Sequence, residues 1–503
     1  MSKNSKVSVV IVNYNGEKFI ADCIDSVLNS NYPNLEIIVV DNRSTDKSKE
    51  ILQNKYGANS LVKLVFANNN LHFAKGSNLG FINSTGDKIM FLNSDTVIDA
   101  KCISELEKCF GKNKKLLVQP KILSFDNINI IDNIGGVYKW PGFGLGQATG
   151  APNSNQLSRP FSVDYANGTC FMIKKQFFKK LGGFDNWFVH HYEDVDLSLR
   201  AKRLKGVCRC CPSAVIYHKE SLSFKNNPNP DQLSLNIVKN QLTTIVKNFN
   251  SIDMVLRLTV SMVILVIRII GNVISLNFSK AHILYLAFLK FKSRVLKIVV
   301  EEQKTCEIKR IINRSNLNIL DVGCGEGLFI DIAKKHNIKA SGVDSEEFFH
   351  PNIYIRLFKN YQHKEKYQVI TMYHFLEHVA NPADALEKAS RLLKTDGTLV
   401  VEVPLVGNLS ERILGKNYFA YQDKSHKHFF KKGDLDDLFS ETKLVVFKKG
   451  FTLLEFPFYL LTFFFKKNIL VGLMSLPIFI LLKIFSLLGM NNEIGRYYLK
   501  KNL

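Results

Sequence analysis

The chain has 503 residues, of which 46% are hydrophobic and 22% charged, and its formal net charge is +22. It is too long for one ordinary hydrophobic core and too apolar for intrinsic disorder, so we expect at least two domains. The one cysteine cluster (Cys208, Cys210 and Cys211) lacks the second ligand pair of a structural zinc site. We therefore expect the nine cysteines to be reduced thiols.

The excess positive charge is concentrated beside apolar segments. Residues 251–300 carry seven Lys or Arg against one acidic residue, and residues 451–503 carry six against two. Basic residues next to apolar helices suit an anionic membrane, through apolar burial and attraction to lipid head groups. This placement favours a membrane surface over nucleic acid as the partner. The apolar run at 7–12 is too short for the core of a signal peptide, which argues against secretion.

The first half alternates short β-branched runs with helical patterns, which predicts a parallel sheet covered by helices. Strands are expected at 7–12, 35–40, 61–66 and 88–92, and helices at 17–28 and 46–55. Residues 116–160 are rich in Gly, Asn and Pro and are expected to be irregular. A helix is expected at 171–181 and a strand at 214–217.

A second alternating series begins near Asn318 and predicts a second α/β domain. Strands are expected at 318–322, 339–343, 367–372 and 398–403, and helices at 328–335 and 382–393. Residues 254–300, between the two series, are apolar but contain Arg257 and Arg268 among other basic residues. They never reach the roughly 20 uncharged residues of a transmembrane helix, so we expect an amphipathic linker in the membrane plane.

The segment at 456–490 contains two apolar runs, 456–465 and 469–490, and the second is broken only by Pro477 and Lys483. It is consistent with a membrane hairpin, a single membrane span or helices packed on the domain. The expected fold class is therefore α/β, with two doubly wound domains, an amphipathic helical linker and an apolar helical insert near the C-terminus. The expected bounds are 1–250, 251–305 and 306–503.

Carboxylate and amide side chains follow three predicted strands of the first half. Asn13 and Asn15 follow the first strand, Asp41 follows the second, and Asn93 and Asp95 follow the fourth. Open α/β sheets bind ligands at the carboxyl ends of their strands. One such residue would be unremarkable as a helix cap or turn residue, but the repetition predicts a binding site.

The segments VSVVIVNYNG, YPNLEIIVVDNRSTDKS, FLNSDT, GGFD, YEDVDL and YHKES occur in this order between residues 7 and 225. Together they resemble family 2 of the inverting glycosyltransferases, most of all its rhamnosyltransferase-like members that build bacterial surface polysaccharides. By this resemblance Asp41 contacts the base or ribose of a nucleotide-sugar, and Asn13 and Asn15 line the same pocket. A bias toward a pyrimidine nucleotide follows from the resemblance alone.

The resemblance also implies a divalent metal and one catalytic base. Mn²⁺ or Mg²⁺ held by Asp95 would stabilise negative charge on the leaving diphosphate. The family often has an aspartate where this chain has Asn93, a neutral oxygen donor that is also expected in the nucleotide-sugar site. Asp194 matches the family's base, although the acids there alternatively cap a helix. His218 is either a further metal ligand, as in some relatives, or a structural residue.

A glycine-rich turn follows the first strand of the second series. Its glycines are Gly323, Gly325 and Gly327, and Asp344 ends the next strand, where it can accept hydrogen bonds from ribose hydroxyls. The nicotinamide-binding pattern would have glycine at the position of Leu328. This turn alone therefore indicates a nucleotide-type ligand but not a nicotinamide cofactor.

With MYHFLEHV, RLLKTDGTLVVEVP and SHKHFF, the turn resembles class I S-adenosylmethionine-dependent methyltransferases that act on small-molecule hydroxyls. The resemblance runs from about residue 318 to the C-terminus and allows the last strand to lie at 493–500. It implies that Asp321, the three glycines and Asp344 bind S-adenosylmethionine, with His374 near the methionine end.

Transfer of a methyl group to a hydroxyl requires positioning of the two reactants and a base. His378, His426 and His428 are candidates for that base. The pair Glu377 and His378 alternatively holds a metal or faces the sheet.

The sequence thus predicts a bifunctional transferase on the cytoplasmic face of the cell membrane. It would move a sugar from a nucleotide-sugar donor to a glycan or lipid-linked glycan acceptor with inversion, and methylate a sugar hydroxyl, in either order. In the alternative, one domain is active and the other is a non-catalytic substrate-binding or membrane-docking module. A nucleic-acid-binding role is not expected, because the chain lacks a basic face with interleaved aromatic residues.

Overall fold

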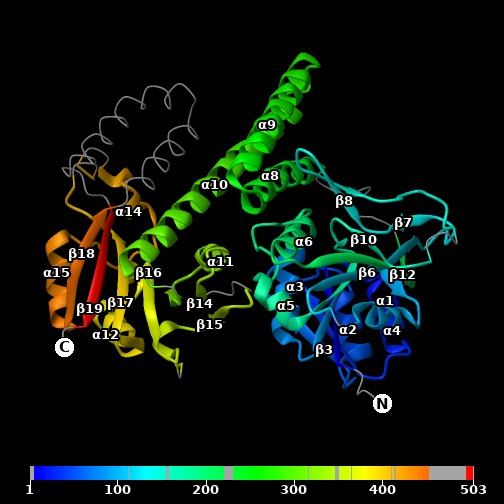
Figure 1. Ribbon diagram of the computed structural model, residues 1–503, viewed down its shortest axis with the longest axis horizontal. Helices are drawn as coiled ribbons and strands as arrows, with labels where there is room; N and C mark the ends of the chain where they lie inside the picture. The colour runs from blue at the N-terminus through cyan, green and yellow to red at the C-terminus, as the bar shows by residue number, and fades with distance from the viewer. Residues whose placement is uncertain are drawn as a thin grey trace. The chain divides into compact units, whose positions relative to one another are not determined.

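The computed structural model describes residues 5–111, 113–154, 158–219, 230–314, 316–345, 350–363, 365–408, 411–412, 415–451 and 494–501. The chain divides into two compact units with the main boundary after Val295 (Figure 1). The segment at 456–490 lies outside the described residues. The domain bounds 1–250, 251–305 and 306–503 stay predictions.

Unit 1 is built on a mixed sheet, and the four parallel strands that the sequence predicts are adjacent in it, in the order β3-β2-β1-β4. Beyond β4 the sheet continues through β11, β6, β12 and β10, with β11 antiparallel to both of its neighbours. The strands of this sheet are β1 (Val7–Asn13), β2 (Leu35–Asp41), β3 (Val62–Phe66), β4 (Lys88–Asn93), β5 (Thr96–Ile98), β6 (Leu116–Ser124), β7 (Ile131–Asn133), β10 (Phe161–Val163), β11 (Cys170–Lys174) and β12 (Val207–His218). Strands β8 (Gly136–Lys139) and β9 (Phe143–Gly146) form a separate antiparallel pair.

Helices cover both faces of this sheet, because alternate residues of each strand point to opposite sides. Val9 and Ile11 of β1 pack in the same core as residues of α1, α2 and α4, whereas Val10 packs with residues of α3 and α5. The helices are α1 (Ile20–Leu28), α2 (Ser48–Tyr56), α3 (His72–Asn83), α4 (Cys102–Phe110), α5 (Lys175–Leu181), α6 (Glu193–Arg203), α8 (Pro230–Asn248) and α9 (Ser251–Ile274).

Helix α3 is absent from the sequence prediction, and its glycines explain why. Gly76 and Gly80 weaken the intrinsic preference for helix. They are needed for packing: a Cβ at Gly76 would lie 2.8 Å from Val12 Cγ1, and one at Gly80 would lie 2.3 Å from Val10 Cγ1. The close approach of α3 to β1 therefore outweighs local propensity.

Three expectations for unit 1 were wrong. The segment 171–181 is a strand, β11, followed by the short helix α5, because its first residues are paired on both sides within the sheet. Residues 116–160, expected to be irregular, contain β6 to β9. Cys109 and Cys211 form a disulfide between α4 and β12, so these two cysteines are not free thiols as expected.

Unit 2 contains a second sheet, in the order β15-β14-β13-β16-β17-β19-β18. Strands β13 to β17 run parallel to one another, and β19 lies antiparallel between β17 and β18. The predicted strands, helices and last strand of this domain are confirmed. Its elements are β13 (Asn318–Val322), α11 (Leu328–Lys335), β14 (Lys339–Asp344), β15 (Ile353–Ile355), η1 (Phe358–Asn360), β16 (Tyr367–Tyr373), η2 (Leu376–His378), α12 (Pro382–Leu392), β17 (Leu393–Pro404), η3 (Gly415–Asn417), α14 (Phe419–Gln422), α15 (Lys432–Glu441), β18 (Leu444–Phe451) and β19 (Ile494–Lys501).

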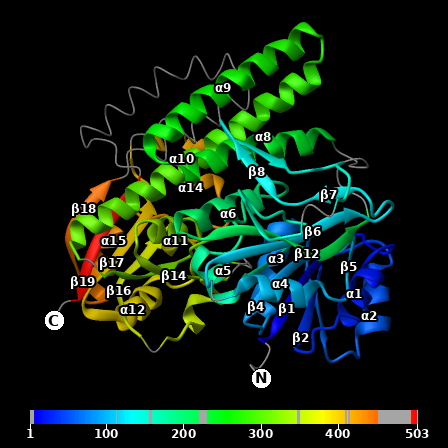
Figure 2. The same cartoon turned by 45° about the vertical axis from the view of Figure 1, so that its right-hand side comes forward.

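The predicted linker is helical and comprises α9 and most of α10 (Phe278–Ile312). In both views α9 lies beside α8 (Figures 1 and 2). Among the described residues, one helix, at Ile252–Ile274, is long and apolar enough to cross a membrane by length and composition, and 11% of its most apolar window is buried. Sequence reasoning set this segment aside because of its arginines. However, Arg257 is folded back onto Phe249 and donates a hydrogen bond to the carbonyl of Pro141.

The packing of α3 on β1 can be tested with one alanine in each of two helices. We expect Gly80→Ala to lower the free energy of unfolding by about 1–3 kcal/mol, because its Cβ would overlap Val10. Gly271→Ala in α9 is the matched control: its Cβ would meet nothing within 4 Å, and alanine is favoured over glycine in a helix by about 1 kcal/mol. Thermal unfolding should show a lower midpoint for the first variant only. Equal midpoints would contradict the packing argument.

Candidate functional sites at two sheet edges

The first site begins where β1 and β2 end side by side. Asn13 and Asp41 are partners in the parallel register, and both side chains are buried. Asn13 Nδ2 donates a hydrogen bond to Asp41 Oδ1 over 3.0 Å, and Ser44 donates to both oxygens of the same carboxylate, at 2.6 and 3.0 Å. The turn after β2 is thereby fixed, and Ser44 is a residue that sequence reasoning did not single out.

Asn15 joins the turn after β1 to the turn after β2. Its backbone has a positive φ of 51°. Its N–H donates to Ser44 Oγ at 3.0 Å, and its Oδ1 accepts from the Thr45 N–H at 2.8 Å. Asn15 itself is exposed, so it lies at the rim of the edge rather than in its floor.

Asp95 and His218 are brought together by strand pairing. Strand β5 runs antiparallel to β12 with Thr96 opposite His218, which places His218 Nε2 3.3 Å from Asp95 Oδ2. The other ring nitrogen, Nδ1, lies 2.8 Å from Asp132 Oδ2. The second oxygen of Asp95, Oδ1, is buried and has no hydrogen-bond partner among the described residues. Asn93, half-buried, ends β4 in the same loop.

The electrostatics of His218 follow from its two carboxylate neighbours. Burial alone would lower the pKa of His218, but the hydrogen bonds and negative charges of Asp132 and Asp95 outweigh it and raise the pKa to about 10. The imidazole thus acts as a cation between two acids in the metal-free protein. Asp132 was missed by sequence reasoning because no motif surrounds it.

Asp194 lies at the start of α6, and backbone groups link its side chain to the loop that contains Asn93. Its Oδ2 accepts from the Gly168 N–H at 2.9 Å, and the carbonyl of the next residue, Thr169, accepts from the Asn93 N–H at 2.9 Å. Burial raises the pKa of Asp194, and the N–H donors of Gly168 and Val195 oppose that rise. Burial and the charge of Asp194 also raise the pKa of the adjacent Glu193, to about 8.

A buried charge network supports α6 from below. Asp196 is fully buried and pairs with Arg200 at 2.8 Å and with Lys247 at 3.2 Å. Lys247 also pairs with Asp185 at 2.6 Å, and Arg294 lies 3.1 Å from the same acid. Removing one member of such a network leaves a buried charge uncompensated, which typically costs about 3–5 kcal/mol. The network therefore holds the first turn of α6, and with it Asp194, in place.

The second site is the glycine turn between β13 and α11. Gly323, Gly325 and Gly327 all have positive φ, of 73°, 52° and 85°. The Gly325 N–H donates to Asp344 Oδ2 at 2.9 Å, which holds the turn against the end of β14. A Cβ on Gly325 would meet nothing within 4 Å, so the turn is open above this residue. A small polar ligand can approach its backbone closely.

Asp321 lies beneath the turn, near the end of β13, with 4% of its surface exposed. Burial raises its pKa to about 7, although the hydroxyl of Thr371 donates to it at 2.6 Å and opposes the rise. Strongly shifted carboxylates in clefts are typical of functional sites. This supports the position predicted for Asp321 without testing its role.

His374 directly follows β16 and has a positive φ of 50°. Its Nδ1 lies 3.3 Å from Glu377 Oε1, and its Nε2 lies 3.5 Å from Glu402 Oε1. Glu402 is fully buried on β17 and is held by Arg496 at 2.5 Å and Lys304 at 3.3 Å. A charged residue inside the apolar run LVVEVP was the signal that could have identified Glu402 from sequence.

The candidate bases of the second half lie near one another but differ in their contacts. Glu377, His378 and His426 each offer a ligand atom within 4.8 Å of the others. His428 instead contacts the carbonyl of Val379 through Nε2 at 3.0 Å. The structure thus groups His426 with Glu377 and His378, and leaves His428 bound to the backbone.

Open α/β sheets bind ligands at the carboxyl ends of their strands, which is where both groups of polar residues lie. The model of glycosyl transferase family 2 matches residues 8–182, and that of a methyltransferase domain matches residues 300–448. The chain therefore carries a glycosyl transferase family 2 domain in its N-terminal part and a methyltransferase domain in its C-terminal part.

Relatives of the first half are glycosyltransferases. A low-salt glycan biosynthesis hexosyltransferase of Haloferax volcanii is 24% identical over 39% of this chain and 62% of its own length. A probable glycosyltransferase of Bacillus subtilis is 28% identical over 45% and 53%. An O-antigen biosynthesis protein of Myxococcus xanthus is 26% identical over 45% and 18%. The chain spans less than two thirds of the length of each of these relatives.

Two solved structures are among those similar to about half of the chain. GalNAc-T7 with UDP, GalNAc and Mn²⁺ is 19% identical, covers 49% of this chain and 48% of its own, and gives a TM-score of 0.41. Staphylococcus aureus TarS in complex with UDP is 17% identical, covers 51% and 70%, and gives 0.36. At these scores neither likeness supports a conclusion about function.

Proposed function

We propose that this chain is a bifunctional enzyme that transfers a hexose from a nucleotide-sugar to a glycan or lipid-linked glycan and methylates a sugar hydroxyl. The observation that carries the proposal is the presence, in each unit, of a turn fixed to an acidic residue at the end of the neighbouring strand. The domain matches and the glycan-related names of the relatives support the same reading. The pathway would be the assembly of a surface polysaccharide.

In the first site, Asp41, Asn13 and Asn15 bind the nucleotide of the donor. Asp95 Oδ1, which has no hydrogen-bond partner in the part of the chain that the structure describes, fits a divalent cation such as Mn²⁺ or Mg²⁺, with Asn93 and His218 as further candidate donors. Such a cation, when bound, stabilises negative charge on the leaving diphosphate. It would also give this buried carboxylate oxygen a partner.

Asp194 is the base for the sugar transfer. It accepts the proton of the acceptor hydroxyl while that oxygen attacks the anomeric carbon from the face opposite the leaving nucleoside diphosphate, which inverts the configuration. Its N–H contacts with Gly168 and Val195 fix the carboxylate in one orientation. Its raised pKa makes it a stronger base than an exposed aspartate.

In the second site, S-adenosylmethionine supplies the methyl group. The backbone of Gly323, Gly325 and Gly327 allows its close approach, and Asp344 accepts from the ribose hydroxyls. Asp321 belongs to the same binding site, and His374 lies near the methionine end of the ligand. The open space above Gly325 fits such a ligand. His426 and His428 are the candidates for the base that accepts the proton of the acceptor hydroxyl.

Helix α9 is the part of the described chain best suited to a lipid surface. Its apolar side chains include Ile252, Ile267 and Ile274, exposed by 77%, 62% and 76%. Exposed apolar surface of this extent is uncommon on a protein that is surrounded by water alone. The enzyme would therefore associate with the inner face of the cell membrane through α9, with the segment at 456–490 as a further candidate for insertion.

Binding of both donors can be measured separately by isothermal calorimetry. We expect the full chain to bind S-adenosylmethionine and, with Mn²⁺ present, UDP or dTDP. Asp95→Ala should abolish only the nucleotide signal and Asp344→Ala only the S-adenosylmethionine signal, because the two residues belong to different sheets. If one ligand fails to bind at any accessible concentration, the bifunctional proposal gives way to one enzyme with an attached recognition domain.

Asp194 and Glu193 offer a matched pair of acids for testing the base. Asp194→Asn should reduce the rate of sugar transfer about 10²–10⁴-fold. Glu193→Gln should change it little at pH 7, because a carboxyl with a pKa of about 8 is already mostly protonated there. In the wild type, the rate should fall as the pH drops through the raised pKa of Asp194, since protonation removes the base.

The pH profile of the sugar transfer and the rates of the two variants check this assignment. A similar loss in both variants at pH 7 would show that the acids act in folding rather than in proton transfer.

Membrane association through α9 can be measured by flotation with anionic vesicles. We expect the double variant Ile267→Gln and Ile270→Gln to bind the vesicles at least roughly tenfold more weakly than the wild type, because each change removes apolar area from the lipid contact. Ile128→Gln, which alters an exposed isoleucine outside α9, is the control. Binding should persist in high salt and be lost in detergent. A chain that stays free of vesicles under all conditions would refute this part of the proposal.

A further inference from the structure

The segment after β16 and the segment after α14 are joined by their backbones. The carbonyl of Glu377 accepts hydrogen bonds from the N–H groups of Lys427 and His428, at 2.7 and 3.2 Å. This clamp sets His426 beside the short helix η2, although the two segments are about fifty residues apart in the chain. As a result Glu377, His378 and His426 offer three ligand atoms within 4.8 Å of one another.

Glu377 is the buried member of this group. Only 1% of its surface is exposed, and neither carboxylate oxygen has a hydrogen-bond partner among the described residues. Oε1 lies 3.3 Å from the Nδ1 atom of His374, and this contact does not meet the geometry of a hydrogen bond. A buried carboxylate in this state is costly unless a cation is bound to it.

The hydrogen bonds of the two histidines leave the same atom of each ring available. His426 Nδ1 lies 2.7 Å from the carbonyl of Ala420, which can only accept, so Nδ1 carries the proton. Its Nε2 keeps its lone pair, because Asp423 Oδ2, at 3.8 Å, is beyond hydrogen-bond distance. His378 Nδ1 lies 2.9 Å from Ser425 Oγ. That hydroxyl donates its hydrogen to Asp423 Oδ1 at 2.5 Å, so it accepts from His378 and leaves Nε2 of this ring free as well.

This is the arrangement expected around metal-binding histidines, whose second ring nitrogen donates to a carbonyl or another oxygen that orients the ring. Two imidazoles with one carboxylate leave open coordination positions, as in catalytic metal sites. The imidazole pair favours a transition metal such as Zn²⁺ over Ca²⁺ or Mg²⁺, and the carboxylate together with the open positions also admits Mn²⁺.

The group also lies next to the glycine turn of the same unit. A Cβ on Gly323 would lie 2.8 Å from the ring of Phe375, which is two residues before Glu377. The Nδ1 and Nε2 atoms of His374 join Glu377 to Glu402 on β17. The three ligand candidates are therefore at the carboxyl edge of the sheet, where an acceptor has to meet the methyl donor.

We propose that Glu377, His378 and His426 bind a divalent transition-metal cation that holds the acceptor hydroxyl for methyl transfer. This inference rests on the proposed methylation of a sugar hydroxyl. The bound cation would lower the pKa of that hydroxyl, whose proton passes to water. The oxygen then attacks the methyl carbon; the new C–O bond forms as the C–S bond breaks, and the electron pair of that bond stays on the sulfur of S-adenosylhomocysteine. His426 would thus be a metal ligand rather than the base.

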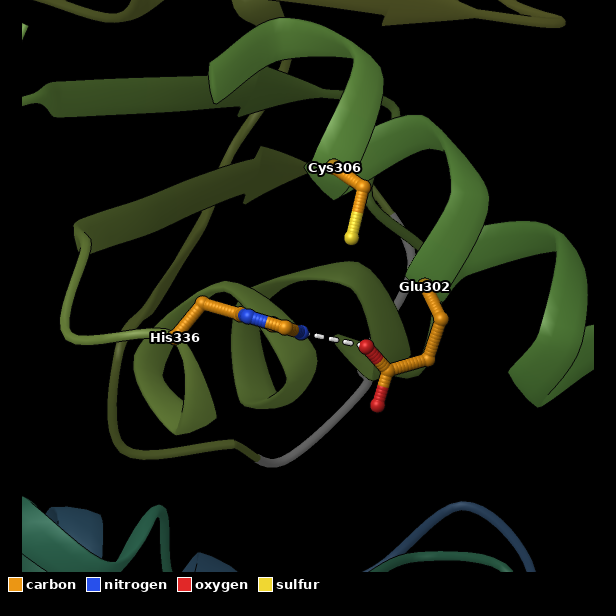
Figure 3. Close-up of side chains that lie close together, drawn as sticks. All are labelled: Glu302, Cys306 and His336. Carbon is orange, nitrogen blue, oxygen red and sulfur yellow. Dashed lines mark hydrogen bonds and ion pairs between the residues drawn. The ribbon is translucent and has the colours of Figure 1, made fainter. Parts of the chain in front are cut away.

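A second group in the same unit also has residue types that can bind a metal, but its carboxylate oxygens already have partners. Glu302, Cys306 and His336 also offer ligand atoms within 4.8 Å of one another. Figure 3 shows the His336 ring directed at the Glu302 carboxylate, with no interaction drawn to Cys306. Lys335 binds the other carboxylate oxygen at 2.5 Å, so each oxygen of Glu302 already has a partner. This group serves as the control.

The test is a Mn²⁺ titration of the full chain, with free Mn²⁺ followed by electron paramagnetic resonance. We expect two bound ions in the wild type and one in Asp95→Ala, which loses the ion of the first unit. Glu377→Gln and His426→Ala should each also bind one ion, now in the first unit, with the affinity for the second ion lowered at least about 100-fold. Ser425→Ala, which removes only the orienting hydroxyl, should weaken the second ion about 10-fold. His336→Ala should match the wild type.

S-Adenosylmethionine binding, measured by calorimetry, should be unchanged in these variants and shows that unit 2 is folded. The inference is overturned if Glu377→Gln and His426→Ala bind two ions as the wild type does, or if methyl transfer keeps its full rate after removal of metal with EDTA. If the second ion binds as expected but no glycan hydroxyl is methylated, the proposed function fails while the cation site stands.

Discussion

In both units, an acidic side chain at the end of one parallel strand fixes the turn that follows its neighbour. Asp41 accepts from the side chain of Asn13, and Asp344 accepts from the backbone of Gly325. Parallel strands make this possible, because their carboxyl ends lie at the same edge and their last residues are in register. Each turn is held open by this bond, so a ligand can reach its backbone. The remaining site residues are arranged around these two turns.

In each unit, an antiparallel strand pair brings further charged side chains to the carboxyl edge of the sheet. In unit 1, the pairing of β5 with β12 sets His218 between Asp95 and Asp132. In unit 2, the antiparallel β19 sets Arg496 against Glu402, and Glu402 in turn lies beside His374. Buried charges in both places are compensated by partners from distant parts of the chain. The charges hold the edge in one arrangement, which an apolar edge would not specify as narrowly.

Local patterns in the sequence were sufficient for the strands, the glycine turn and the helices whose apolar residues recur with the right period. Strand β19 was placed by the family resemblance, in which the last strand follows the apolar insert, whereas helix α11 has the bounds predicted from its own pattern. Features of the second kind depend on residues close together in the chain. The polar residues at the strand ends were found for the same reason, since a strand end is visible locally.

The parts that sequence reasoning missed depend on contacts between distant residues. The contact of His218 with Asp132 spans 86 positions, and that of Arg294 with Asp185 spans 109. Strand β11 looked helical because a short apolar run has no diagnostic period until its neighbours β4 and β6 are known. Helix α3 was missed because its glycines serve the packing against β1. In each case tertiary register, which no local pattern encodes, decided the outcome.

Buried carboxylate oxygens without partners bear on whether both units are active. Asp95 Oδ1 in unit 1 and both oxygens of Glu377 in unit 2 are in this state among the described residues. A buried polar atom left unsatisfied costs about 1–3 kcal/mol of stability. A cation bound at each sheet edge would remove this cost. The proposal that both units are active therefore rests on the same kind of buried oxygen in each of them.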